Sequence, residues 1–276
     1  MNIIFYGTSG SIPAPGPQRV LIGGNTPCVH VSAHNHAIIL DAGSGLRELG
    51  YLLLNKPCPI DIFISHYHID HIYGLGFFMP FFEEDREINI WGPGTSKEQV
   101  RAALDKFLSP PLFPVGLNDF NAKINIHAIP TKEFRRHEFL IQAHQIQHSG
   151  LTLGYRINAQ DKILAYLPDH EPFWGLKQLP DCDQEISGFS LAQGADLLIH
   201  DSQFTNEEYK NHIGWGHSAI SHAVEFARRC RVKKLVTFSH DPSHSDEQII
   251  NMAHEANLKA STFGVIPGTE KQEIII

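Results

Sequence analysis

One short segment, residues 65–71, constrains this chain more than any other part of its sequence. It contains four potential metal ligands within six residues: His66, His68, Asp70 and His71. The chain has 18 histidines, so an isolated histidine here would be interpreted as an ordinary surface residue. A cluster of this density instead predicts metal binding, and its imidazole and carboxylate groups favour zinc, manganese or iron over calcium or magnesium.

The segment follows an apolar run, 60–64, whose β-branched and aromatic side chains predict a buried strand. If the extended backbone continues past this strand, His66 and His68 project to the same side and can bind one ion. Asp70 and His71 come after the chain changes direction, so they would bind a second ion beside the first. The sequence therefore predicts a two-ion site at the edge of a sheet.

Strand-like and helix-like apolar patterns alternate along the rest of the chain. Strands are expected at 2–6, 28–32, 37–40, 60–64, 88–91, 122–129, 138–147, 151–157, 163–167, 197–199, 235–239, 263–266 and 272–276. Helices are expected at 46–54, 95–108, 219–230 and 245–257. Three further candidate ligands each come at the end of an expected strand: His148, Asp169 and His240. His144 is an alternative to His148, and the alternative role for Asp169 is that of an ordinary turn residue.

The H-x-H-x-D-H spacing of the first four ligands resembles the signature of the metallo-β-lactamase superfamily. This resemblance implies an α/β fold, a four-layer αββα sandwich of mixed sheets with a dinuclear metal site between them, formed by a single domain of residues 1–276. The glycine-rich segments 7–13 and 23–28 are similar to the amino-terminal loop of the branch that contains ribonuclease Z-like and cyclic-phosphodiesterase-like enzymes. The superfamily hydrolyses lactams, thioesters and phosphodiesters, so the fold alone does not identify a substrate.

The resemblance also implies how two divalent ions, zinc first and manganese or iron as alternatives, would be held. One ion would be held by His66, His68 and His148. The other would be held by Asp70, His71 and His240. Asp169 would bridge both ions. His148 is preferred over His144 because the glycine at 150 and the segment 154–156 match the family's third-ligand segment. Asp41 would brace a ligand from below the site, and helix capping is its alternative role.

A leaving alkoxide must be protonated even when a metal-bridging hydroxide replaces a serine or cysteine nucleophile. His217, at the start of an expected helix, and Asp201, after an expected strand, are the candidates for this step. Their segments resemble the His-containing and acidic loops of ribonuclease Z-like phosphodiesterases. The alternative interpretation is that His217 is an ordinary residue at a helix start and Asp201 an ordinary turn residue. The catalytic interpretation is preferred because the positive helix end would lower the pKa of a histidine that lacks a carboxylate partner. With Asp70, this pair completes the predicted catalytic set.

Charge and spacing restrict the expected partners. The net charge of −8 repels long polyanions on average. His148 and Asp169 are only 21 positions apart, which leaves room for a hairpin but not for the long tRNA-binding arm of ribonuclease Z. The cysteine cluster of the similar phosphonate-pathway cyclic phosphodiesterase is also missing. We therefore expect a small phosphodiester, such as a cyclic nucleotide, as substrate, and no long nucleic acid as partner.

The four cysteines are far apart and form no CxxC pair, so neither a disulfide framework nor a structural zinc site is expected. The first residues are strand-like and lack a charged leader, and no apolar run has the length of a membrane span. We therefore expect a cytoplasmic enzyme without membrane contact. The apolar stretch 77–82 would pack in the interior or against a second copy in a homodimer.

Two other functional classes remain open. A thioester hydrolase of the glyoxalase II type would need no acid at His217, because a thiolate leaves readily. Only 36 residues follow His240, which is too few for the helical carboxy-terminal domain usual in that class. A non-enzymatic sensor or interaction module would keep the metal ligands without hydrolysing a substrate.

Overall fold

The computed structural model describes residues 1–56, 58–174, 180 and 182–276. Its strands form two seven-stranded sheets. The first sheet has the strand order β14 (Glu273–Ile275), β1 (Asn2–Gly7), β2 (Cys28–Ala33), β3 (His36–Leu40), β4 (Ile60–Phe63), β5 (Glu87–Gly92) and β6 (Lys123–Ala128). The second has the order β13 (Gly264–Pro267), β12 (Lys234–Phe238), β11 (Leu197–Asp201), β10 (Lys162–Leu167), β9 (Thr152–Ala159), β8 (Phe139–Ile146) and β7 (Phe134–Arg136). Both sheets combine parallel and antiparallel pairs.

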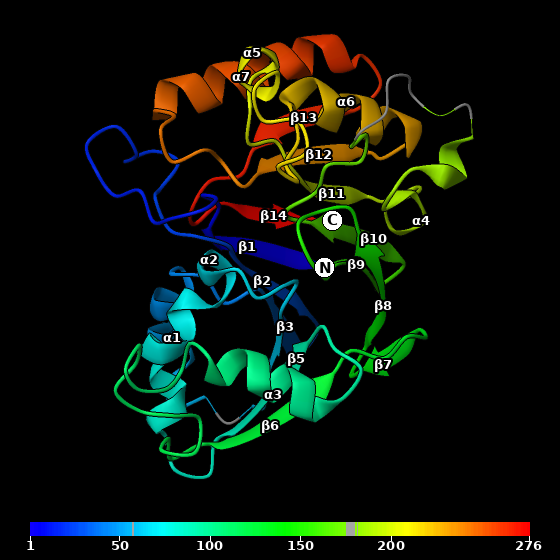
Figure 1. Ribbon diagram of the computed structural model, residues 1–276. Helices are drawn as coiled ribbons and strands as arrows, with labels where there is room; N and C mark the ends of the chain where they lie inside the picture. Colours follow the sequence, from blue (N-terminus) through cyan, green and yellow to red (C-terminus); the bar gives the residue numbers. More distant parts are fainter. Residues whose placement is uncertain (57, 175–179, 181) are drawn as a thin grey trace.

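Helices cover the outer face of each sheet (Figure 1). The first sheet is covered by α1 (Leu46–Leu53) and α3 (Lys97–Asp105), and the second by α4 (Phe189–Ala192), α6 (Ile220–Arg229) and α7 (Asp246–Ala260). Shorter elements lie in the connections: α2 (Ile69–Ile72), η1 (Tyr73–Phe77), η2 (Met79–Phe82), η3 (Asp183–Glu185) and α5 (Asn206–Tyr209). Among the described residues, no helix combines the length and the apolar character that crossing a membrane requires.

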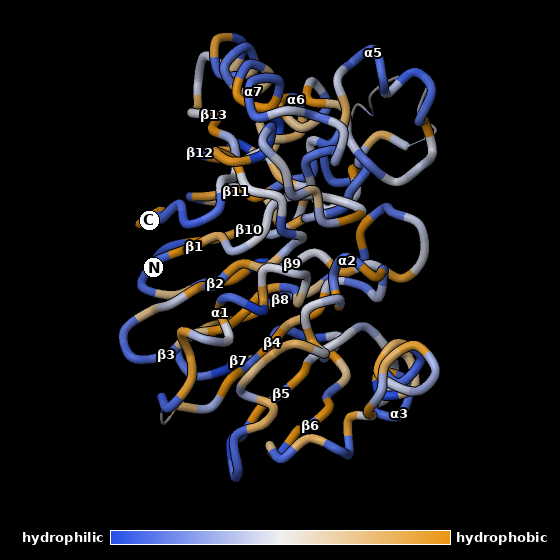
Figure 2. Tube along the Cα trace, turned by 90° about the vertical axis from the view of Figure 1, so that its left-hand side faces the viewer, coloured by the Kyte–Doolittle hydropathy of each residue, from blue (hydrophilic) through white to orange (hydrophobic). Residues whose placement is uncertain are grey.

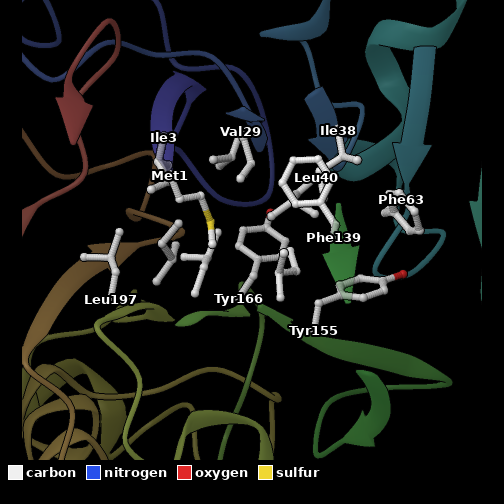
Figure 3. Close-up of a cluster of buried hydrophobic side chains, with 14 of the residues drawn as sticks. Met1, Ile3, Val29, Ile38, Leu40, Phe63, Phe139, Tyr155, Tyr166 and Leu197 are labelled. Atoms are coloured by element: carbon white, nitrogen blue, oxygen red, sulfur yellow. The ribbon is translucent and has the colours of Figure 1, made fainter. Parts of the chain in front are cut away.

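The main core lies between the two sheets. Alternate side chains of β1 to β4 meet those of β8 to β11, and Figure 3 shows the two sets facing each other. Phe63 on β4 packs edge-on against Tyr155 on β9, with ring centroids 6.1 Å apart. In Figure 2 the hydrophobic colour follows strands such as β4, β5 and β12. One face of these strands is covered by helices and the opposite face packs against the second sheet of the sandwich. These layers confirm the expected αββα sandwich of mixed sheets.

The expected helices and strands are all present, with ends that differ by a few residues. The short strand β7 and the single-turn helix α5 were not anticipated, because three or four residues carry too little periodicity to recognise. In the apolar stretch 77–82, Phe78 and Phe81 are fully buried, whereas Phe77 and Phe82 remain about half exposed. The expectation of interior packing is therefore confirmed for only part of that stretch.

Strand direction determines where the candidate ligands lie. β3 and β4 are parallel, as are β10, β11 and β12. β8 is antiparallel to β9, which is antiparallel to β10, so β8 and β10 run in the same direction. The loops after these strands therefore meet at one edge of the sandwich, where side chains from distant parts of the sequence converge.

We predict that the inter-sheet core dominates stability. Replacing the fully buried Ile157 with alanine, Ile157→Ala, should lower the free energy of unfolding by about 2–5 kcal/mol, because a cavity remains between the sheets. Ile275→Ala, at a side chain that is 76% exposed, is the matched control and should cost under about 1 kcal/mol. Urea unfolding of both variants measures the difference; similar losses would contradict the prediction.

Candidate metal centre

Three overlapping groups of potential ligand atoms lie at this edge. Their members are His66, His68, His148 and Asp169; Asp70, His71 and Asp169; and Asp169, Asp201 and His217. Within each group the ligand atoms lie within 4.8 Å of one another. Asp169 belongs to all three, so the whole arrangement centres on one buried carboxylate.

The first group is rich in imidazole. The Nε2 atoms of His66 and His148 each lie 3.7 Å from Oδ2 of Asp169. His68 completes the group, with its Nδ1 3.2 Å from Nε2 of His148. His68 directly precedes α2, as expected from the change of chain direction after the strand.

The second group uses the other oxygen of Asp169. Nε2 of His71 lies 3.3 Å from Oδ1 of Asp169 and 3.3 Å from Oδ2 of Asp70. Tetrahedral zinc with bonds of about 2.0–2.1 Å would place neighbouring ligand atoms about 3.3–3.4 Å apart. The two oxygens of Asp169 thus face two separate sets of donors, as a bridging carboxylate requires.

The chemistry of the donors fits metal ions. Nε2 of His66 and Nε2 of His71 are buried, and neither has a hydrogen-bond partner among the described residues. Burial lowers the pKa of His66 well below its usual value, so its ring stays neutral and can donate a lone pair. Burial alone would raise the pKa of Asp169, but His71 and His217 hold it well below its usual value. Burial alone would lower the pKa of His71, but Asp169, Asp70 and Asp41 raise it well above its usual value, so this ring would release a proton as an ion binds.

Asp41 supports the second group from below. Its Oδ2 accepts hydrogen bonds from Nδ1 of His71, Oγ of Ser65 and the hydroxyl of Tyr166, each at 2.8 Å. The Nδ1 contact leaves Nε2 of His71 free to face the site. The residue that caps α1 is Gly45, not Asp41. Bracing, rather than helix capping, is thus the role the geometry gives to Asp41.

Glu171 supports the site, a role that sequence reasoning did not assign to it. It is fully buried, and its carboxylate accepts hydrogen bonds from the backbone N–H of Gly214 at 2.9 Å and of Gly216 at 2.7 Å. The carbonyl of Gly216 in turn accepts a hydrogen bond from Nδ1 of His148 at 2.7 Å. Glu171 therefore fixes the loop that both orients His148 and leads into His217. In the sequence, the available signal was a glutamate four positions after an apolar run that predicts a strand.

His217 and Asp201 meet as expected for a proton-donating pair. Nδ1 of His217 lies 2.6 Å from Oδ2 of Asp201, and its Nε2 lies 3.9 Å from Oδ2 of Asp169. Burial lowers the pKa of His217, but the carboxylates of Asp201 and Asp169 outweigh this effect and raise it to about 9. The other oxygen of Asp201 accepts the backbone N–H of Ser218 at 2.9 Å. The imidazole is thus held in place with its second nitrogen toward the ligand groups.

The structure does not bring His240 into these groups, and this expectation is corrected. Nε2 of His240 instead lies 2.9 Å from the carbonyl oxygen of Gly268. The preceding residue, Ser239, faces the centre, with its Oγ 3.3 Å from Oδ1 of Asp169. β12 ends one residue earlier than expected, and Ser239 adopts a left-handed conformation with φ of 56°, so successive side chains point in directions that strand alternation does not give. The competitor His144 lies outside the groups, with its Nδ1 3.2 Å from Oγ of Ser190.

Comparison with known proteins identifies the family. The sequence model of one protein family, the beta-lactamase superfamily domain, matches residues 36–240 of this chain. Ribonuclease Z from Thermococcus sibiricus is 27% identical, over 92% of this chain and 91% of its own length. The crystal structure of human tRNase Z, short form, has a TM-score of 0.65 at 19% identity and covers 100% of this chain and 99% of its own. The crystal structure of a new diphosphatase from the PhnP family has a TM-score of 0.69 at 16% identity and covers 100% of this chain and 97% of its own.

These relatives contradict one expectation, the exclusion of long nucleic acid as a partner. Relatives named ribonuclease Z match nearly the whole chain, and the short-form tRNase Z shares its fold. Net charge averages over the entire surface, whereas a site of two cations would reverse the sign locally. The short hairpin of β9 and β10 is present as expected, but it does not justify that exclusion. With the matched segment spanning most of the chain and containing the ligand groups, this protein belongs to the beta-lactamase superfamily.

Proposed function

We propose that this metal-dependent hydrolase of the beta-lactamase superfamily cleaves phosphodiesters at a centre of two divalent ions, with zinc as the first choice. The observation that carries the proposal is the position of Asp169, whose two oxygens face separate donor groups beside the His217–Asp201 pair. Its relatives include proteins named ribonuclease Z and a diphosphatase, which supports phosphate chemistry over lactam or thioester chemistry.

In this proposal the metal ligands divide between two sites. One site comprises His66, His68, His148 and one oxygen of Asp169, and the other comprises Asp70, His71 and the second oxygen of Asp169. Ions bound there would supply an activated water and an electrostatic clamp for the anionic phosphoryl oxygens. Asp41 and the Glu171-anchored loop keep His71 and His148 oriented, because each fixes the nitrogen that faces away from the site.

His217 completes the reaction by protonating the leaving group. The activated water would release one proton to solvent and its oxygen would form a bond to phosphorus; the bond from phosphorus to the leaving oxygen would break, and that oxygen would take the proton from Nε2 of His217. Asp201 accepts the Nδ1 hydrogen bond throughout, so it stabilises the protonated ring before transfer and holds the ring in place afterwards. A pKa raised to about 9 keeps this proton on His217 at neutral pH.

A cyclic nucleotide-like diester stays our prediction for a small substrate, and the ribonuclease Z relatives make RNA a substrate that must be tested beside it. Two exposed apolar side chains adjoin site residues: Leu151, in the turn after His148, and Trp215, two positions before His217. Of the two, the aromatic ring of Trp215 is suited to stacking against a nucleobase, which favours a nucleotide-containing diester.

We predict that the metal-loaded protein hydrolyses phosphodiesters in preference to thioesters. The panel consists of bis-p-nitrophenyl phosphate, cyclic nucleotides, a precursor tRNA and a glutathione thioester, assayed by product release. Activity should disappear on chelation and return when zinc or manganese is added, because the water is activated only with ions bound. Faster cleavage of the thioester, or no cleavage of any diester by fully metallated protein, would refute the proposal.

Replacing His217 with alanine tests the acid. His217→Ala should reduce kcat/KM for a diester with a poor alkoxide leaving group by roughly 10²–10⁴-fold. The loss should be far smaller for bis-p-nitrophenyl phosphate, since p-nitrophenolate leaves without a proton. His254→Ala, at an exposed histidine on α7, is the control and should match the unmodified protein on both substrates. An equal loss on the two substrates would rule out proton donation by His217.

A further inference from the structure

The two donor groups differ in chemistry, and the difference arises where β12 ends. Ser239 is fully buried, and its hydroxyl donates to Oδ1 of Asp169, the oxygen that also faces His71. Its 3.3 Å separation from that oxygen equals the distance from Oδ1 to Nε2 of His71. The only histidine next to it, His240, turns its Nε2 to a backbone carbonyl. A hydroxyl therefore occupies the position where the sequence had suggested an imidazole.

A second oxygen points to the same place. A methyl group on Gly10 would lie 2.5 Å from Oγ of Ser239 and 3.2 Å from Oε1 of Gln203, so both oxygens border one small space. Gln203 is only 5% exposed, and its Oε1 is buried without a hydrogen-bond partner among the described residues. The adjoining backbone N–H of Ser11 donates to Oδ2 of Asp70 at 2.8 Å. An unpaired amide oxygen thus lies beside the loop that contacts a ligand of the second group.

The resulting donor sets favour different ions. The first group offers three imidazoles and one carboxylate oxygen, a combination that suits zinc. The second offers one imidazole and two carboxylates, with the hydroxyl of Ser239 beside them. Carboxylate-rich sets suit manganese better than imidazole-rich sets do, although zinc outranks manganese on any single site, and a neutral oxygen donor binds zinc less strongly than an additional imidazole would.

We propose that the two ion sites are unequal: the three-histidine site retains zinc, whereas the Asp70–His71–Asp169 site, assisted by Ser239, binds manganese and exchanges it readily. This inference rests on the two-ion centre of the proposed function. It adds that the natural state is a mixed zinc–manganese pair and that Ser239 determines the choice of the second ion.

Metal binding tests the inference without an activity assay. Apoprotein is titrated with zinc alone and, separately, is given one equivalent of zinc, dialysed against buffer with excess manganese and analysed for metal content; manganese binding to the zinc-loaded form is measured by calorimetry and electron paramagnetic resonance. We expect one tightly held zinc per chain, and one manganese whose Kd is at least about 10-fold weaker than that of the zinc. Two zinc ions retained with equal affinity would overturn the proposal.

Variants at Ser239 separate the hydroxyl from general effects on folding. Ser239→Ala should weaken manganese binding by about 10-fold or more while leaving the first zinc in place. Ser239→His should instead allow a second zinc to be retained, because it adds an imidazole to the second site. Ser243→Ala, at an exposed serine nearby in the sequence, is the matched control, and circular dichroism checks that each variant is folded. Unchanged manganese affinity in folded Ser239→Ala would refute the role of the hydroxyl.

The outcomes also distinguish this inference from the proposed function. One zinc and one manganese bound without diester hydrolysis would support the unequal sites and contradict the phosphodiesterase. Diester hydrolysis by a protein with two equivalent zinc ions would support the phosphodiesterase and overturn the unequal sites.

Discussion

The burial of several carboxylates at one edge of the sandwich is the constraint on which the rest of the structure depends. Asp41 and Asp169 are almost completely inaccessible, and Asp70 is 5% exposed. Their ion-pair partners are all histidines. Burying negative charge is costly unless positive charge compensates it. A centre of two divalent ions would provide that compensation, so stability and catalysis place the same demand on this edge.

The fold meets this demand by anchoring ligands through both sheets. Asp41 follows β3 of the first sheet, yet it accepts a hydrogen bond from Tyr166 on β10 of the second. Glu171 follows β10 and holds the loop before α6, whose Gly216 carbonyl positions His148. Each ligand group is therefore supported by residues of the opposite sheet or of a distant loop. Movement between the sheets would displace the ligands, and for this reason the inter-sheet core matters to the site.

Similarity within the superfamily constrains the chemistry more than the substrate. Ribonuclease Z relatives cover the chain at 22–27% identity, and the fold also matches a diphosphatase of the PhnP family. A dinuclear centre of the proposed kind would act on the phosphoryl group, which all phosphodiesters share, whereas selectivity depends on surface loops that vary in this fold. Net charge was a poor guide to the partner because recognition depends on the local field.

The sequence by itself determined the layered fold and most of the centre. The dense ligand cluster after β4 and the regular alternation of strands and helices were enough, because parallel strands carry the residues at their carboxyl ends to one edge. The structure brings His148, Asp169 and the His217–Asp201 pair together at that edge for the same reason. Tertiary structure alone decided that Ser239, and not His240, faces the centre. Ser239 adopts a left-handed conformation and contacts Asp169, which lies 70 positions away in the sequence, and no local pattern encodes such a contact. The bracing contacts of Glu171 likewise join segments more than 40 residues apart, a distance over which periodicity carries no information.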